Sequence, residues 1–552
     1  MDDATEEPPA MRAPHMLPGH LRLKPAVGAL SALLTLSLAA SAQAQLPEIP
    51  PLEDDEASEG RVVELAPPRL NPVFPVDEPE EPTVSLEGHY RLSADAYERP
   101  LTDGLRGGMY QQLRLGSTIN LGAVEAVASA DLLSGRLLGN SYPAPPPVGD
   151  HGARPFHRVL DGADQTLAMR ELYLRWDSPV GRVQAGLQTS QWGLGLLAND
   201  GDIEDETLFG EQVGGDRVAR LLFATSPFRG RASRGALDNL FVAVGADAVI
   251  RDENADINKG DRALQGIASV VWRPAPSEIG VYVALRDQTD RDGSELNVAA
   301  FDLAGKHQFY TPKGTWRFRI AGEAAYLRGE TTRADGSDPT SPIQIDALGA
   351  AAHLDVLHRP SALGFNLRSG FASGDADPRS DNLHRFRFDP NYRAGLLLFD
   401  HHLPAYTAEA VAQADDPLRA AQPPRGIDNL VETGSVSNAI FVQPTLTFAR
   451  IAGLELGAGA LLAWAHRPWR DLAASVEAGG SVVGFRGTEA SARYLGTEAL
   501  LGARYTHLLT PELALEYRAE AAMFWPGSVF DDAQGRPDAR TALVRAHITA
   551  LW

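Results

Sequence analysis

The 552-residue chain contains no cysteine, and only four of its 50 basic residues are lysines. The absence of cysteine excludes disulfide bonds, thiolate metal sites and a cysteine nucleophile. The sequence also lacks the H-E-x-x-H, G-x-S-x-G and P-loop motifs of metalloproteases, hydrolases and nucleotide-binding enzymes. We therefore predict that the protein is not an enzyme and needs no cofactor. Its formal net charge of −22 also disfavours nucleic acid as a partner.

Long apolar runs are missing after residue 46, so no helical membrane span is expected there. The uncharged stretch at residues 25–46 follows Arg22 and Lys24 and ends near Ala42-Gln43-Ala44. A basic start, a short apolar core and an A-x-A site are typical of a secretory signal peptide. We assign residues 1–44 to it, with a start-site extension at residues 1–20, and expect cleavage after Ala44. The apolar core is short for the alternative, an uncleaved anchor.

Residues 45–87 have the composition of a linker. They contain nine prolines and twelve acidic residues but only two basic residues, Arg61 and Arg69. Such a segment buries too little apolar surface to fold. We predict a disordered periplasmic arm, which is either a plain spacer or a partner-binding segment.

Residues 88–552 have the pattern of about 18 β-strands, the first at Gly88–Glu98 and the last at Thr541–Trp552. Apolar and polar residues alternate in these strands, and short connections alternate with long ones. This loop pattern is typical of outer-membrane barrels, in which periplasmic turns are short and extracellular loops long. The sequence predicts an all-β fold, a transmembrane antiparallel up-and-down barrel in the bacterial outer membrane.

The last strand, Thr541–Trp552, has one apolar face and one face with Arg545, His547 and Thr549, and it stops on an aromatic residue. It resembles the closing strand of bacterial outer-membrane barrels. The resemblance implies pairing with the first strand and recognition by the barrel assembly machinery. A strand of a soluble sandwich is the alternative for this stretch alone.

Charged side chains share one face of many strands. Because a charge facing lipid is costly, these faces are expected to line a wet lumen. The predicted pore-lining residues are Arg114, Arg175, Arg286, Arg317, Arg319, Glu323, Arg368, Arg504, Glu516, Arg518 and Arg545. Inward arginines favour anions. Alternatively, arginine and glutamate pair across strands and line a nonselective lumen.

Several short motifs resemble those of uncharacterised Gram-negative outer-membrane barrels and, more distantly, of the alginate export family. They are residues 191–201 (QWGLGLLANDG), 214–218 (GGDRV), 371–378 (FASGDADP) and 388–392 (FDPNY). The alginate export resemblance implies an 18-stranded barrel whose arginine-rich constriction passes an acidic polysaccharide.

The connection Gly374–Ser437 is the longest, and its apolar run 394–399 indicates either a constriction inside the lumen or a plain extracellular loop. No metal is expected. Asp375, Asp377 and Asp381 are only weak Ca²⁺ candidates, because they match no EF-hand loop.

Together these patterns predict a porin-like channel for small polar or anionic solutes. The alternatives are an exporter of an anionic polysaccharide and a plugged structural or adhesive barrel. The sequence leaves open the solute and the oligomeric state.

Overall fold

The computed structural model describes residues 82–98, 101, 104–139, 167–202, 207–211, 214–228, 236–334, 341–375, 381–414, 431–471, 474–475, 478, 483–488 and 491–552. The predicted signal peptide and most of the predicted linker lie outside these residues. β1 begins at Thr83, however, so the last five residues that we assigned to the linker, Thr83–Glu87, belong to the first strand.

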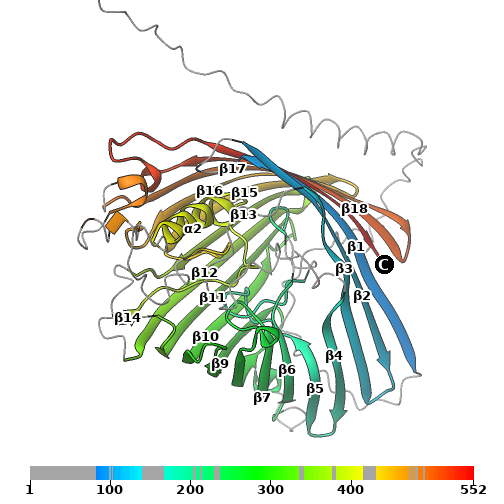
Figure 1. The fold of residues 1–552 in the computed structure, drawn as a ribbon. Coiled ribbons are helices and arrows are strands. Elements are labelled where there is room, and N and C mark those ends of the chain that lie inside the picture. Colours follow the sequence, from blue (N-terminus) through cyan, green and yellow to red (C-terminus); the bar gives the residue numbers. More distant parts are fainter. Residues whose placement is uncertain are drawn as a thin grey trace, which may run out of the picture. The chain divides into compact units, whose positions relative to one another are not determined.

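The described chain forms one antiparallel sheet that closes on itself (Figure 1). Closure comes from β1 pairing with β19, in a register that places His89 opposite Leu551. The strands are β1 (Thr83–Glu98), β2 (Leu105–Asn120), β3 (Val124–Gly139), β4 (Leu167–Ser178), β5 (Gly181–Thr189), β6 (Arg217–Thr225), β7 (Leu240–Arg251), β8 (Arg262–Trp272), β9 (Ser277–Thr289), β10 (Glu295–Tyr310), β11 (Trp316–Thr331), β12 (Ile343–His358), β13 (Leu363–Ala372), β14 (Asn382–Leu383), β15 (Ala439–Ile451), β16 (Leu454–Ala465), β17 (Tyr494–Thr510), β18 (Leu513–Pro526) and β19 (Thr541–Leu551).

β14 is not part of the wall. It has two residues and pairs in parallel with β12, whereas β13 pairs directly with β15. Removing β14 from the 19 described strands leaves a wall of 18, each antiparallel to its neighbours. The prediction of an 18-stranded up-and-down barrel is confirmed.

Most connections alternate in length around the barrel; the exceptions are residues 226–239 between β6 and β7 at the short end and residues 290–294 between β9 and β10 at the long end. At one end they are short, as at residues 121–123 between β2 and β3 and residues 452–453 between β15 and β16. At the other end they are long, as at residues 190–216 between β5 and β6 and residues 373–438 between β13 and β15. By the rule for outer-membrane barrels, the end with short turns is periplasmic.

The outer face of the wall is apolar and the inner face is polar. Large apolar side chains are exposed at alternate positions, such as Phe301, Leu303 and Phe309 of β10. Tryptophans with 37–51% exposure lie at strand ends, as interfacial aromatic residues do: Trp176, Trp272, Trp316, Trp525 and Trp552. Such an exterior faces lipid, as expected for the bacterial outer membrane. Among the described helices, none is long and apolar enough to cross a membrane.

Two connections fold into the barrel. We call residues 190–202, 207–211 and 214–216 the first inserted segment, and residues 381–414 together with 431–437 the second. The second contains a π-helical turn (Leu398–His402) and the helix α2 (Leu403–Ala414), which lies within the curve of the wall in Figure 1. The all-β pattern did not predict this helix.

The main hydrophobic core lies inside the barrel. It combines apolar side chains of both inserted segments with small residues of the inner wall. Fully buried members from the segments are Leu196, Phe386, Phe388, Leu396, Leu397, Leu398 and Phe399. Wall alanines such as Ala325 and Ala347 leave room for them. The long connection therefore fills the lumen, and a plain extracellular loop, the other possibility left by the sequence, is wrong for its described part.

Candidate functional site

The first inserted segment is held by two carboxylates of the wall. Glu323 of β11 accepts hydrogen bonds from the backbone N–H groups of Leu194 and Leu196, the latter at 3.1 Å. Asp302 of β10 accepts one from the indole N–H of Trp192 at 3.0 Å. Glu323, one of the predicted pore-lining residues, thus holds this segment against the wall.

The second inserted segment is held in the same way by β17. Glu498 accepts hydrogen bonds from the N–H groups of Leu396, Leu397 and Leu398 at 2.5, 3.1 and 3.2 Å. The preceding Gly395 donates its N–H to the side chain of Gln443 at 2.9 Å. Gly395 has φ +67°, and a Cβ there would lie 2.7 Å from Glu498. Glycine is therefore required at this close approach.

The two inserted segments also contact each other. The N–H of Asp389 donates to the carbonyl of Leu196 at 2.8 Å, and the Arg393 guanidinium donates to the carbonyl of Glu211 at 3.0 Å. They therefore form one insert, which is attached to β10 and β11 through the first segment and to β15 and β17 through the second.

Most of the predicted pore-lining arginines are paired with carboxylates. Arg114 lies 2.6 Å from Asp131, Arg504 lies 2.5 Å from Glu455 and Arg518 lies 2.9 Å from Glu520. Arg545 lies 3.9 Å from the same Glu520. Arg175 pairs with Glu125, and Arg286 pairs with Asp252. The structure thus distributes these residues around the wall in several ion pairs, and Arg518 and Arg545 share one carboxylate.

Three predicted arginines form a different group on β11 and β13. Arg317 and Arg319 alternate with the outward residues Trp316 and Phe318, so they face inward. Arg368 faces inward as well and donates to the carbonyl of Arg393 at 3.4 Å. We call Arg317, Arg319 and Arg368 the basic stripe.

The basic stripe is only partly balanced by acid. Asp355 of β12, in register with Arg319, adds one carboxylate to this part of the inner face. Within the described chain, Arg317 and Arg368 have no carboxylate at ion-pair distance. Glu516 of β18 lies on the inner face away from this group, half-buried and in register with Thr506.

Of the weak Ca²⁺ candidates, Asp375 and Asp381 lie in the described part of the chain, where each makes a hydrogen bond to another residue. Asp375 accepts a hydrogen bond from the N–H of His384 at 3.1 Å, and the carbonyl of Asp381 accepts one from Gln344. Asp377 lies outside the described residues.

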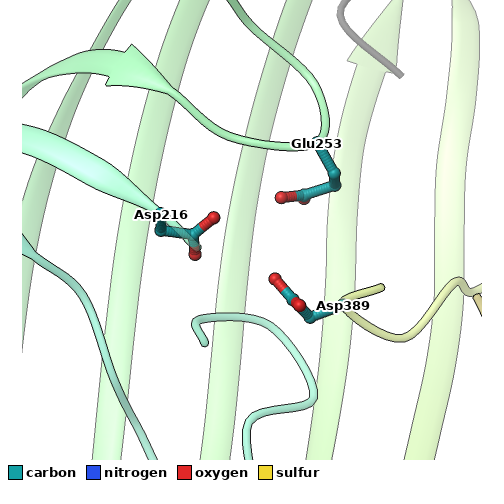
Figure 2. A group of neighbouring side chains, drawn as sticks. All are labelled: Asp216, Glu253 and Asp389. Atoms are coloured by element: carbon teal, nitrogen blue, oxygen red, sulfur yellow. The ribbon is translucent and has the colours of Figure 1, made fainter. Parts of the chain in front are cut away.

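A group of carboxylates that we did not predict lies at the insert instead: Asp216, Glu253 and Asp389 (Figure 2). Burial, followed by the neighbouring Asp252, raises the pKa of Glu253 to about 7. Burial and the facing carboxylates also raise the pKa values of Asp216 and Asp389 well above the ordinary range. Two of these residues stand in motifs that the sequence had marked, 214–218 and 388–392, but no spacing in the sequence links them to Glu253.

Comparisons with known proteins give no family. No family model matches the chain, and no curated protein matches it. Solved structures from Pseudomonas aeruginosa are similar over most of their length. The outer-membrane protein OpdK has 12% identity and a TM-score of 0.44, covering 85% of this chain and 99% of its own. OccK2 in complex with glucuronate has 12% identity and a TM-score of 0.43, covering 84% and 97%. OccK8 (OprE) has 9% identity and a TM-score of 0.44, covering 85% and 98%.

These similarities are low, and the fold assignment rests on the strand pairing itself. None of the comparisons supports the resemblance to the alginate export family.

Proposed function

We propose that this protein is an outer-membrane channel that passes small anionic or polar solutes through a lumen narrowed by the two inserted segments. The observation that carries the proposal is the basic stripe: three inward arginines on β11 and β13 with one carboxylate in register between them. Charged side chains along a pore wall set its selectivity, and arginine favours anions.

The position of the basic stripe suits this role. Glu323, which holds the first inserted segment, lies in the middle of β11, and Arg319 and Arg317 lie four and six residues closer to the periplasmic end. At a strand rise of about 3.3 Å per residue, these are separations of roughly 13 and 20 Å along the strand. A solute that passes the insert therefore meets the basic stripe next.

The other arginines contribute little to selectivity. Pairs such as Arg175 with Glu125 and Arg504 with Glu455 have no net charge. They connect neighbouring strands. This cross-strand pairing is the alternative role that the sequence left open for all of the predicted pore-lining residues.

Assembly follows from the proposed location. We propose that the signal peptide is cleaved near Ala44, that residues 45–82 form a periplasmic arm, and that the barrel assembly machinery recognises β19. The reciprocal hydrogen bonds between Gly88 and Trp552, at 2.9 and 3.0 Å, support β19 as the strand that closes the barrel.

A second candidate is a barrel that stays closed until its insert moves, either as an exporter of an anionic polysaccharide or as a plugged structural barrel. The hydrophobic core inside the lumen favours it, because seven fully buried apolar side chains of the segments do not form a water-filled path.

Single-channel recording in planar bilayers tests the proposal. The refolded protein is expected to give stable openings and a reversal potential that shows anion preference in a salt gradient. Replacing the basic stripe, Arg317→Gln/Arg319→Gln/Arg368→Gln, is expected to abolish that preference while openings persist.

The matched control is Arg504→Gln/Glu455→Gln, which removes an inward arginine together with its acid and should leave the preference unchanged. Well-inserted protein that conducts only after residues 386–402 are deleted would reject the open channel and support the closed barrel. Unchanged selectivity in the triple variant would reject the basic stripe as the filter.

A further inference from the structure

Three carboxylates from three separate connections meet beside the insert. Asp216 ends the first inserted segment immediately before β6, Glu253 lies in the connection between β7 and β8, and Asp389 belongs to the second inserted segment. One carboxylate oxygen of each lies within 4.8 Å of the others. Figure 2 shows the three side chains pointing toward a shared space.

In each carboxylate, one oxygen accepts a hydrogen bond and the other has no hydrogen-bond partner. Asp216 accepts from the N–H of Asn199 at 3.3 Å, Asp389 accepts from the N–H of Asn391 at 2.7 Å, and Glu253 accepts from the side chain of Asn254. The buried oxygens Asp216 Oδ1, Glu253 Oε2 and Asp389 Oδ2 make no hydrogen bond. Asp216 is 5% exposed and Asp389 2%. Buried charged oxygens without partners are costly, so the arrangement indicates a missing positive partner.

The guanidinium groups whose charge acts on Glu253 and Asp389 belong to Arg286 and Arg393, and each is paired with another acid. Arg286 binds Asp252, and Arg393 lies 2.8 Å from Asp400. Asp252 itself adds to the negative potential at Asp216 and Glu253. Three carboxylates therefore share one space with no guanidinium of their own.

We propose that Asp216, Glu253 and Asp389 bind one divalent cation, Ca²⁺, that locks the two inserted segments to each other and to the β7–β8 connection. All three donors are carboxylate oxygens, which suit hard cations and not the metals that prefer sulfur or imidazole. Oxygens bound to one Ca²⁺ at 2.3–2.6 Å lie at most about 5 Å apart, which these three satisfy. Waters complete the coordination on the side of Glu253, which is the least buried of the three.

The cation would act where the insert is assembled. Asp389 already joins the two segments through its N–H bond to the carbonyl of Leu196. The bonds from Asn199 and Asn391 fix the orientation of both aspartates before any ion binds. Ca²⁺ binding would replace the repulsion among the three carboxylates with three contacts to one cation. It should therefore stabilise the barrel with both segments folded inside. This inference does not depend on the proposed transport function.

Calorimetric titration of the full chain with CaCl₂ tests the site. The protein is refolded in detergent without lipopolysaccharide and dialysed against a chelator, so that no lipid-bound cation contributes. We expect one saturable Ca²⁺ per chain and a rise in unfolding temperature on adding Ca²⁺. Asp216→Asn and Asp389→Asn preserve side-chain shape and should each weaken binding roughly tenfold or more. They should also remove the thermal shift.

The matched control is Asp375→Asn, which neutralises a carboxylate of the same long connection outside the group and should bind Ca²⁺ as the unmodified chain does. Titration with MgCl₂ followed by CaCl₂ tests the choice of ion: Ca²⁺ should displace Mg²⁺. Three outcomes would overturn the proposal: no saturable binding, unchanged binding in both aspartate variants, or loss of binding only in Asp375→Asn. Because no conductance is measured, failure here is separate from failure of the channel proposal.

Discussion

The carboxylate of Glu498 on β17 accepts the backbone N–H of Leu396 at 2.5 Å, and the same side chain receives the next two N–H groups of the chain. One wall residue thus satisfies three consecutive donors of a segment that would otherwise bury them without partners. This relationship explains how an apolar run within a long connection stays inside a polar lumen.

Replacing this carboxylate should loosen the second inserted segment. In Glu498→Gln, one of the two acceptor oxygens becomes an NH₂ group that faces N–H donors. We expect the attachment of the segment to weaken by about 1–3 kcal/mol. Faster cleavage of the segment in limited proteolysis and more frequent conductance changes should report it. Glu516→Gln, also on the inner face, is the control and should behave as the unmodified protein; equal proteolysis of both variants would contradict the role of Glu498.

The buried ion pair at β2 and β3 should matter more for stability than the half-buried one at β16 and β17. Asp131 lies 2.6 Å from Arg114 and 3.8 Å from Arg170. Asp131→Asn leaves these buried guanidiniums unbalanced and should lower the free energy of unfolding by about 3–5 kcal/mol. Glu455→Gln breaks the half-buried pair with Arg504 and should cost only about 0–1 kcal/mol. Urea unfolding from lipid vesicles measures both, and similar losses would contradict the difference in burial.

The lipid-facing side of the barrel wall should not tolerate a charged side chain. Leu303 is the ninth residue of the sixteen in β10 and is 49% exposed on the outer face. Leu303→Arg should destabilise the inserted barrel by about 2–4 kcal/mol, the cost of arginine near the bilayer midplane. The loss of stability is measured by folding the variant into lipid vesicles and following the gel shift of the folded barrel. Leu303→Ala keeps the position apolar and should fold normally; normal folding of the arginine variant would argue against lipid contact.

A pH-sensitive contact joins α2 to the β18–β19 connection. Burial alone would raise the pKa of Asp538, but its contacts with His402 and Tyr406 outweigh this, and its pKa is lowered below 3.8. A carboxylate with a lowered pKa stabilises the fold above its unfolded value and loses that contribution as the pH falls through the folded value. The Tyr406 hydroxyl donates to Asp538 at 2.5 Å.

Tyr406→Phe should therefore bring the pKa of Asp538 back toward its ordinary value. We expect a lower unfolding temperature near neutral pH and a smaller fall in that temperature below about pH 4 than in the unmodified protein. Thermal unfolding over this range is the measurement. Tyr505→Phe, on a half-exposed ring of β17, should leave the pH profile unchanged, and an unchanged profile in Tyr406→Phe would refute the contact.

The wall of the barrel follows from local pattern. Residues such as Arg317, Arg319 and Glu323 alternate with Trp316, Phe318 and Ile320, so their faces can be assigned before the structure is known. The short and long connections then indicate which end of the barrel faces the periplasm. The exact start of β1 could not be assigned, because residues 83–87 continue a linker whose composition is acidic and proline-rich.

The interior depended on tertiary structure. Alternation shows that Arg114 and Glu323 face inward, but not that Arg114 meets Asp131 or that Glu323 holds Leu194 and Leu196. These partners come from register and from segments that return into the lumen. The helix α2 was missed because its region reads as a loop between strands, and its burial depends on contacts such as those of Tyr406 with Phe485 and Phe530 of two other connections.

The sequence by itself determined the fold class and the alternation of apolar and polar faces along each strand, because a two-residue period and alternating loop lengths are local properties of the chain. Only the tertiary structure decided which charges cancel, how the lumen is filled, and that Asp216, Glu253 and Asp389 meet. The physical reason is that closing a sheet and folding two long connections into it bring together residues whose separation along the chain carries no periodic signal.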